Sequence, residues 1–155
     1  MTVVYVDADA CPVKNEVLKV AARHALAVCL VANSRMRVED DPLVRCIVVP
    51  EGADAADDWI AEQCGPGDLV VTGDIPLADR CLKRGARVVG HDGRPFTSDN
   101  IGAALAMRDL KAGLREVGDL ASGGGGGPAF SARDRSRFLQ AMENMVQAAR
   151  REARR

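Results

Sequence analysis

The residues best suited to chemistry are acidic side chains that directly follow short apolar segments. Asp7 and Asp9 come immediately after the apolar, β-branched run 2–6, and Asp74 follows the apolar run 69–72. Carboxylates that lie close together repel one another unless a cation sits among them. Their hard oxygen atoms are ligands that Mg²⁺ and Mn²⁺ prefer. The spacing therefore predicts a divalent-metal site, provided that the fold brings the acids together.

A metal ion held in this way has a definite chemical use. It lowers the pKa of bound water, which becomes a nucleophile, and it stabilises negative charge on a phosphoryl oxygen. We predict Asp7, Asp9 and Asp74 as metal ligands. Asp57, at the start of an expected helix on the same edge, completes the catalytic set. The simpler alternative for the D-x-D pair is that one of Asp7 and Asp9 caps the helix that follows and the other is solvated.

The elements that must position these acids alternate along the chain. Apolar runs predict strands at 2–6, 27–32, 45–49, 69–72 and 86–89, and helical periodicity predicts helices at 13–24, 54–64, 76–84 and 100–117. We expect a loop at 90–98. Such alternation is typical of a parallel sheet with right-handed crossovers. If the first strand lies between the second and the fourth, Asp7, Asp9 and Asp74 meet where the strand order reverses, and such sheets bind ligands there.

Composition narrows the class of protein. The chain has 155 residues, enough for one domain, and only 3% of them are aromatic, so few rings are available to stack on bases. Its five cysteines include no C-x-x-C pair, which indicates reduced thiols rather than a zinc site or a disulfide framework. No run is long enough to span a membrane and no signal peptide is evident. We therefore expect a cytoplasmic protein.

The C-terminal part of the chain differs in charge from the rest. Residues 122–155 contain seven arginines and three acidic residues, although the whole chain has a net charge of −1. We divide the chain into an α/β body (1–121), a Gly-rich linker (122–130) and a basic amphipathic helix (131–155) of the same domain. Ser131 and Asp134 have the spacing of a capping box. The arginine face predicts phosphate contacts, unless it is simply a solvated surface.

Several polar residues allow more than one interpretation. Asn33 and Ser34 follow the second strand and could contact a substrate, although Asn33 could instead close a turn. Arg108 could bind a phosphate or pair with Asp109. Trp59 is predicted to belong to the core. The two histidines, His24 and His91, have no ligand spacing and are predicted to be surface or loop residues.

Longer motifs resemble those of a known family. They are VDADACPV at 6–13, LVAN at 30–33, GADAAD at 52–57, VTGDIPLA at 71–78, NI at 100–101, MRD at 107–109 and SARDR at 131–135. In this order, from the first strand to about residue 145, the chain resembles the YaiI/YqxD family of uncharacterised bacterial proteins. Members of that family are similar to PIN-like domains, which are metal-dependent nucleases with an acidic cluster.

The resemblance implies a three-layer PIN-like α/β fold, a parallel sheet with helices on both faces. On that pattern Asp7 matches the acid after the first strand, and Asp74 the later acid with a preceding hydroxyl, here Thr72. Asp57 matches the helical acid, and Asp9 and Asp79 are additional acids. The complete set of predicted substrate-binding residues is Asn33, Ser34, Thr72, Asp79, Arg108, Arg133 and Arg135.

Two other functions compete with this one. Haloacid-dehalogenase-type phosphatases also have an apolar strand followed by D-x-D, with the first acid as a covalent nucleophile and the second as acid/base. Here Cys11 replaces their usual Thr or Val, and no lysine occurs between residues 20 and 82. The third candidate is a non-enzymatic module that binds nucleic acid or metal. We favour a nuclease that uses Mg²⁺ or Mn²⁺ on nucleic acid, with RNA the first choice, and leave a homo-oligomer open.

Overall fold

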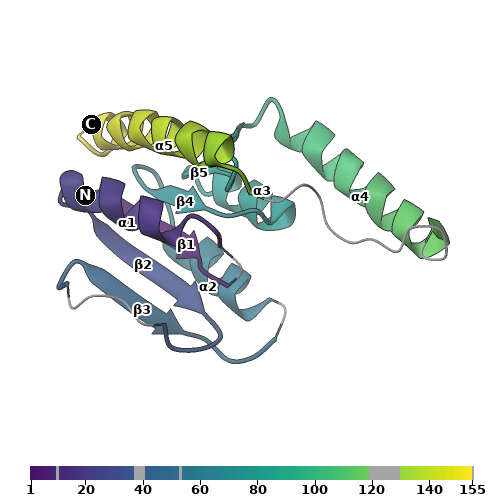
Figure 1. Ribbon diagram of the computed structural model, residues 1–155, viewed down its shortest axis with the longest axis horizontal. Helices are drawn as coiled ribbons and strands as arrows, with labels where there is room; N and C mark the ends of the chain where they lie inside the picture. The colour runs from purple at the N-terminus through teal and green to yellow at the C-terminus, as the bar shows by residue number, and fades with distance from the viewer. Residues whose placement is uncertain (10, 37–40, 53, 119–129, 155) are drawn as a thin grey trace.

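The computed structural model describes residues 1–9, 11–36, 41–52, 54–118 and 130–154. Within them, six strands form one sheet in the order β3-β2-β1-β4-β5-β6 (Figure 1). They are β1 (Val3–Asp7), β2 (Ala27–Ala32), β3 (Val44–Val48), β4 (Leu69–Val71), β5 (Arg87–Val89) and β6 (Pro95–Phe96). Strands β1 to β5 run parallel, and β6 is antiparallel to β5. The predicted position of the first strand, between the second and the fourth, is confirmed.

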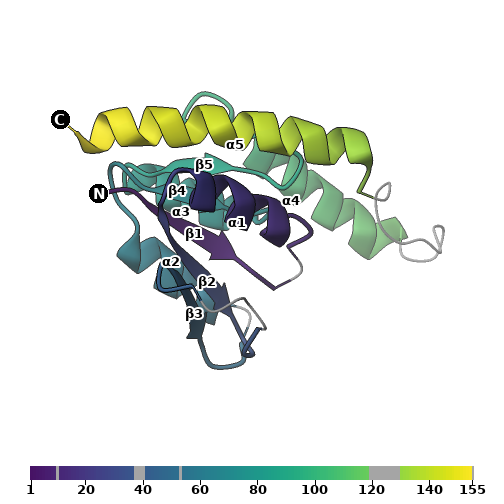
Figure 2. The same ribbon diagram turned by 60° about the vertical axis from the view of Figure 1, so that its left-hand side comes forward.

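Helices cover both faces of this sheet. They are α1 (Lys14–Arg23), α2 (Ala55–Gln63), α3 (Ile75–Lys83), α4 (Ile101–Gly118) and α5 (Ala132–Ala153). Helices α1 and α5 pack on one face, and α2 and α3 on the other (Figures 1 and 2). The predicted three-layer α/β fold is therefore confirmed. No helix in the described part of the chain is both long and apolar enough to cross a membrane.

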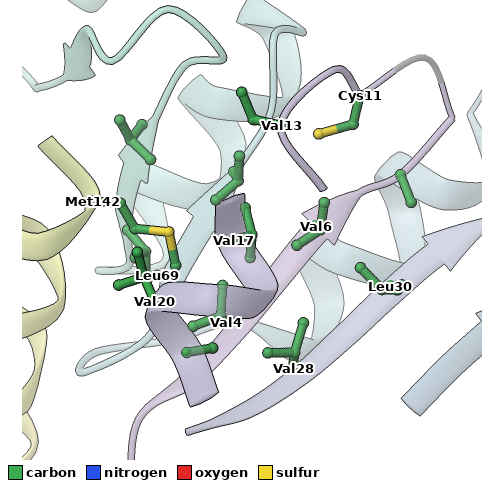
Figure 3. Packing of buried hydrophobic residues seen from close by; sticks show 14 of the residues in the cluster. Val4, Val6, Cys11, Val13, Val17, Val20, Val28, Leu30, Leu69 and Met142 are labelled. Atoms are coloured by element: carbon green, nitrogen blue, oxygen red, sulfur yellow. The ribbon is translucent and has the colours of Figure 1, made fainter. Parts of the chain in front are cut away.

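The two cores follow from the alternation of side chains along the strands. Val4 and Val6 of β1 point to the face covered by α1 and α5, where Val17 and Met142 meet them (Figure 3). Tyr5 points to the opposite face, where its ring lies 6.0 Å from that of Trp59. Trp59 packs against this second core, as predicted.

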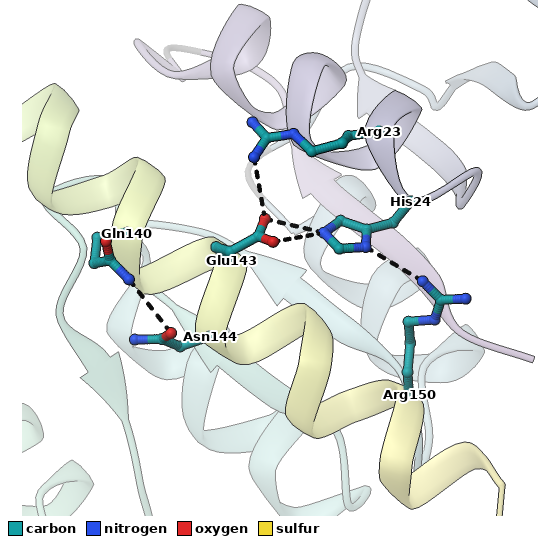
Figure 4. Close-up of polar contacts among 6 residues, drawn as sticks. All are labelled: Arg23, His24, Gln140, Glu143, Asn144 and Arg150. Carbon is teal, nitrogen blue, oxygen red and sulfur yellow. Dashed lines mark hydrogen bonds and ion pairs between the residues drawn. The ribbon is translucent and has the colours of Figure 1, made fainter.

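Helix α5 is joined to α1 by both apolar and polar contacts. The predicted capping box of Ser131 and Asp134 is present. His24 Nε2 lies 2.9 Å from an oxygen of Glu143, and Arg150 donates to His24 Nδ1 at 3.2 Å (Figure 4). His24 lies in the turn after α1, as predicted, but the sequence did not indicate that its ring contacts α5. Its partners are more than 100 positions away in the chain, beyond the reach of any local spacing rule.

Two regions depart from the expected pattern. The loop predicted at 90–98 contains β6, a strand of two residues, which is too short to produce a recognisable periodicity. Helix α4 buries Ile101 in its first turn, but Met107 and Leu110 are more than half exposed, and the helix projects from the body (Figure 1). The predicted linker at 122–130 lies, apart from Phe130, outside the described residues.

Candidate functional site

The candidate site lies at the carboxyl edge of the sheet, between β1 and β4. These neighbours pair in parallel with Val6 opposite Val71, so Asp7 and Thr72 are adjacent at the strand ends. The chain leaves β1 through α1 towards β2, and leaves β4 through α3 towards β5 on the other side. A crevice forms where such connections diverge, and ligands bind there in open α/β sheets.

A buried hydroxyl connects two of the predicted acids. The Thr72 side chain donates to Asp7 Oδ2 at 3.0 Å, and its oxygen accepts from the Asp74 backbone N–H at 3.0 Å. Thr72 has no exposed surface, so it lies beneath the acids and orients them. The sequence places Thr72 among the substrate-binding residues, whereas in the structure its hydroxyl is engaged by these two protein groups.

Asp74 also begins helix α3. Its Oδ1 accepts from the Leu77 N–H at 3.0 Å, which is an N-cap bond. The simpler alternative for Asp7 and Asp9, in which one of them caps the helix that follows, is wrong, because Val13 is the N-cap of α1 and makes no side-chain cap hydrogen bond. The capping acid is instead Asp74, which uses one oxygen for the cap. A carboxylate has a second oxygen, and Asp74 also lines an open cleft. Capping and ligand binding are compatible at this residue.

The negative charge of Asp74 acts on both Asp7 and Asp57. Burial raises the pKa of Asp57 to about 6, and the negative charges of Asp74 and Asp7 add to the effect. Burial also raises the pKa of Asp7, a shift that the Thr72 hydrogen bond opposes and the charges of Asp74 and Asp9 reinforce. Such shifts arise when carboxylates lie near one another in a partly buried place.

Asp9 is held at the rim of the site. Its Oδ2 accepts from the Asn33 backbone N–H at 2.9 Å and ties the end of β1 to the end of β2. Asn33 and Ser34 are exposed at this edge. Among the described residues, no three His, Cys, Asp or Glu side chains are arranged to hold a metal ion. Each acid instead uses a protein donor: Asn33 N–H for Asp9, Leu77 N–H for Asp74 and the Thr72 hydroxyl for Asp7.

A cleft of about 600 Å³ opens beside Asp74, between α3, β6 and α4. It contains the predicted phosphate contact Arg108, together with two cations that the sequence reasoning missed. The residues that matter for its chemistry are Asp74, Arg94, Phe96, Met107, Arg108 and Lys111. Arg94 and Lys111 could have been proposed only by knowing that β6 and α4 lie beside α3, which is a tertiary feature.

The remaining predicted substrate contacts are distributed around this edge. Asp79 pairs with Lys83 at 2.9 Å on α3, so it is already engaged. Arg135 pairs with Glu16 at 3.0 Å, in the first turn of α1. Because α1 starts at the carboxyl edge, the start of α5 lies at the same edge as the acids. Arg133, in the first turn of α5, is exposed.

His91 is a further residue of the site that sequence reasoning missed. It follows β5, so it shares the carboxyl edge with Asp7 and Asp74, and its ring packs on Gly73. Burial lowers the pKa of His91, which favours the neutral ring. Its Nε2 is buried without a hydrogen-bond partner in the described part of the chain. Its position two residues after a predicted strand was the available signal.

Cys11 lies near the acids in the sequence but belongs to the core. Its side chain is buried, at 5% exposure. Burial raises the pKa of Cys11 to about 11, so the thiol stays protonated at neutral pH. Cys11 therefore contributes packing rather than a nucleophile.

Comparison with known proteins places the chain in a family. A UPF0178 protein of Parvibaculum lavamentivorans is 64% identical over 151 residues, which cover 97% of both chains. A UPF0178 protein of Ruegeria pomeroyi is 54% identical over 153 residues and 99% of both chains. No solved structure shows a significant match. A family model described as "Uncharacterized BCR, YaiI/YqxD family" matches residues 5–148. The chain therefore belongs to the YaiI/YqxD family, as its motifs predicted.

Proposed function

We propose that this protein is a divalent-metal-dependent nuclease of PIN-like fold that hydrolyses phosphodiester bonds. The observation that carries the proposal is the pair Asp7 and Asp74, joined through the buried Thr72 hydroxyl at the crevice between β1 and β4. The half-buried carboxyl of Asp57 faces the same charges. The sheet order, with acids at the carboxyl ends of β1 and β4, supports the PIN-like assignment.

The donor set fits Mg²⁺ or Mn²⁺. All of the acids offer hard carboxylate oxygens. Burial and, after it, repulsion between the acids raise the pKa of Asp7 and Asp57, and a cation would relieve the repulsion. When bound, such an ion supplies an activated water and stabilises charge on a phosphoryl oxygen. Asp7 and Asp74 would hold it, and Asp9 would join after leaving the Asn33 N–H. Asp57, whose half-buried carboxyl faces the same charges, would accept a proton from the attacking water.

The partner and the compartment belong to the same proposal. Nucleic acid, with RNA as the first choice, supplies the phosphodiester. The five cysteines are all free thiols, which is typical of proteins in the reducing cytoplasm.

The metal site is tested by thermal unfolding with and without Mn²⁺. A ligand that binds only the folded state stabilises it, so we expect Mn²⁺ at millimolar concentration to raise the Tm by several degrees. Asp7→Asn and Asp74→Asn should stay folded, because Asn still accepts from Thr72 or caps α3, and both should lose the Mn²⁺ response. Glu62→Gln, at an exposed acid on α2, should keep it. An unchanged wild-type Tm, with no heat of Mn²⁺ binding in calorimetry, would contradict the site.

The identity of the nucleophile separates this proposal from a phosphatase. A phosphatase of the haloacid-dehalogenase type would attack with the Asp7 carboxylate, whereas a nuclease attacks with water. Asp79, the second acid in the phosphatase interpretation, is paired with Lys83. We expect Mn²⁺-dependent cleavage of a single-stranded oligonucleotide and little hydrolysis of a small phosphomonoester. A beryllofluoride adduct on Asp7, with oligonucleotides left intact, would favour the phosphatase.

A further inference from the structure

The cleft beside Asp74 has one wall built from a single face of α4. Ala104, Met107, Arg108 and Lys111 line it, and their spacing of three, four and seven residues places them on one side of the helix. Phe96 of β6 contributes an apolar surface, and Arg94 follows the turn before β6. Three cations, the two acids Asp74 and Asp92, and four apolar side chains therefore line this space.

These cations are weakly engaged within the protein. Arg94 Nε lies 3.4 Å from an oxygen of Asp92, and an Arg108 nitrogen lies 3.8 Å from an oxygen of Asp109. Both pairs are largely solvent-exposed, and ion pairs of this kind contribute little to stability. Lys111 is exposed and forms no ion pair with the residues that the structure describes. All three side chains can therefore turn to an anionic ligand at small cost.

The walls of the cleft are held in place by local contacts. Asn100, at the start of α4, donates from Nδ2 to the Pro95 carbonyl of β6 at 2.9 Å. Asp92 accepts from the Arg94 N–H at 3.0 Å in the turn before β6. Gly93 of the same turn packs directly on the backbone of Arg137 in α5. A cleft fixed in this way is formed before any ligand binds, which lowers the entropy cost of binding.

We propose that this cleft binds the backbone of a single-stranded nucleic acid on one side of the phosphate that a metal ion at Asp7 and Asp74 would hold. The inference rests on the proposed nuclease function and adds the path of the strand. Arg94, Arg108 and Lys111 match consecutive phosphates, and Phe96 and Met107 give a base an apolar surface. Unpaired bases can reach that surface, so a single strand fits better than a duplex. A space of about 600 Å³ lies in the range of pockets that enclose small ligands, so it suits one or two nucleotides.

Binding is measured without cleavage, by fluorescence anisotropy of a labelled 12-nucleotide RNA strand in EDTA over a range of salt concentrations. The double charge reversal Arg108→Glu with Lys111→Glu should weaken binding at least about tenfold at low salt. It should reduce the slope of log K against log salt by about 1.4, near 0.7 for each phosphate of a single strand that the variant no longer neutralises. A DNA strand of the same sequence shows whether the cleft prefers RNA.

Two controls separate a local role from a general effect of charge. Lys19→Glu reverses an exposed cation on α1 and should change binding much less. Arg108→Lys with Lys111→Arg keeps the charge and should retain most of the affinity. Both replaced residues are exposed, so all variants should keep the wild-type Tm.

The outcomes distinguish the cleft from the nuclease. Three outcomes would overturn the cleft. The double reversal could bind with wild-type affinity, Lys19→Glu could weaken binding equally, or the wild type could bind neither strand at low salt. Weakened binding in the double reversal, combined with no Mn²⁺-dependent cleavage by the wild type, would uphold the cleft and overturn the nuclease. Cleavage by the wild type, combined with unchanged binding in the double reversal, would uphold the nuclease and overturn the cleft.

Discussion

The half-buried carboxyl of Asp57 links the stability of the fold to the chemistry proposed for the sheet edge. Its pKa is raised to about 6, so the folded protein binds this proton more tightly than the unfolded chain does. The free energy of unfolding therefore falls as the pH rises from about 4 to about 6, and it stays lower above that range. An ionised Asp57 is a destabilising residue in the metal-free protein.

Replacing this acid should stabilise the metal-free protein. At pH 7 in EDTA we expect Asp57→Asn to gain about 1 kcal/mol, a value that allows for solvent screening at a half-buried site. The gain should disappear below about pH 4, where the wild-type carboxyl is protonated in both states. Urea unfolding at several pH values measures it, and Glu62→Gln on the exposed face of α2 serves as the control. A less stable Asp57→Asn variant at pH 7 would contradict the assigned origin of the shift.

Some residues of the site could be predicted and others could not. Asp7 and Asp74 could be predicted because apolar runs mark where strands end, and the carboxyl ends of parallel strands lie at one edge of the sheet. Asp57 could be predicted because it lies in the first turn of a helix that begins at that edge. The partners Thr72–Asp7 and Asn33–Asp9 depend on side-chain geometry, and Arg94 and Lys111 depend on how β6 and α4 pack. No spacing of residues along the sequence predicts those contacts.

Among the elements, the turn between β5 and β6 connects the site to α5. Gly93 has φ +86°, a backbone conformation that disfavours residues with a Cβ. A Cβ there would lie 2.8 Å from the Arg137 carbonyl carbon and oxygen. The close approach of turn and helix therefore requires glycine. The sequence pattern predicted α5 correctly but gave no indication of this contact, because β6 was too short to recognise.

Gly93→Ala should therefore destabilise the protein by about 1–3 kcal/mol, through backbone strain and the displaced α5 contact. Because Arg94 is the next residue, the variant should also weaken oligonucleotide binding to the cleft. Gly102→Ala is the matched control, since its Cβ would meet nothing within 4 Å and its position in α4 is helical. That change should be neutral or slightly stabilising. Equal Tm changes in the two variants would show that the turn does not depend on α5.

At the scale of the whole molecule, α5 completes a core that the N-terminal part of the chain cannot close alone. Phe138, Met142 and Val146 are fully buried in the same cluster as Val4 and Val17. Figure 3 shows Met142 beside the residues of α1 and β1. Residues near the two ends of the chain therefore share one core. The apolar stripe of α5 predicted a docking face, and the sheet face beneath it is the partner that the sequence alone could not identify. The body and the last helix should unfold together.

Phe138→Ala tests that coupling. Truncating a fully buried phenylalanine removes apolar contacts and leaves a cavity, so we expect a decrease in stability of about 3–5 kcal/mol. Trp59 packs on the opposite face of the sheet, so its fluorescence reports unfolding far from the mutation. If the molecule is one cooperative unit, Trp59 fluorescence and far-UV circular dichroism should give coincident transitions in the wild type and the variant. Gln140→Ala, on the exposed side of α5, should leave both midpoints almost unchanged. A Trp59 transition that stays at the wild-type midpoint while helical signal disappears earlier would show that α5 unfolds as a separate unit.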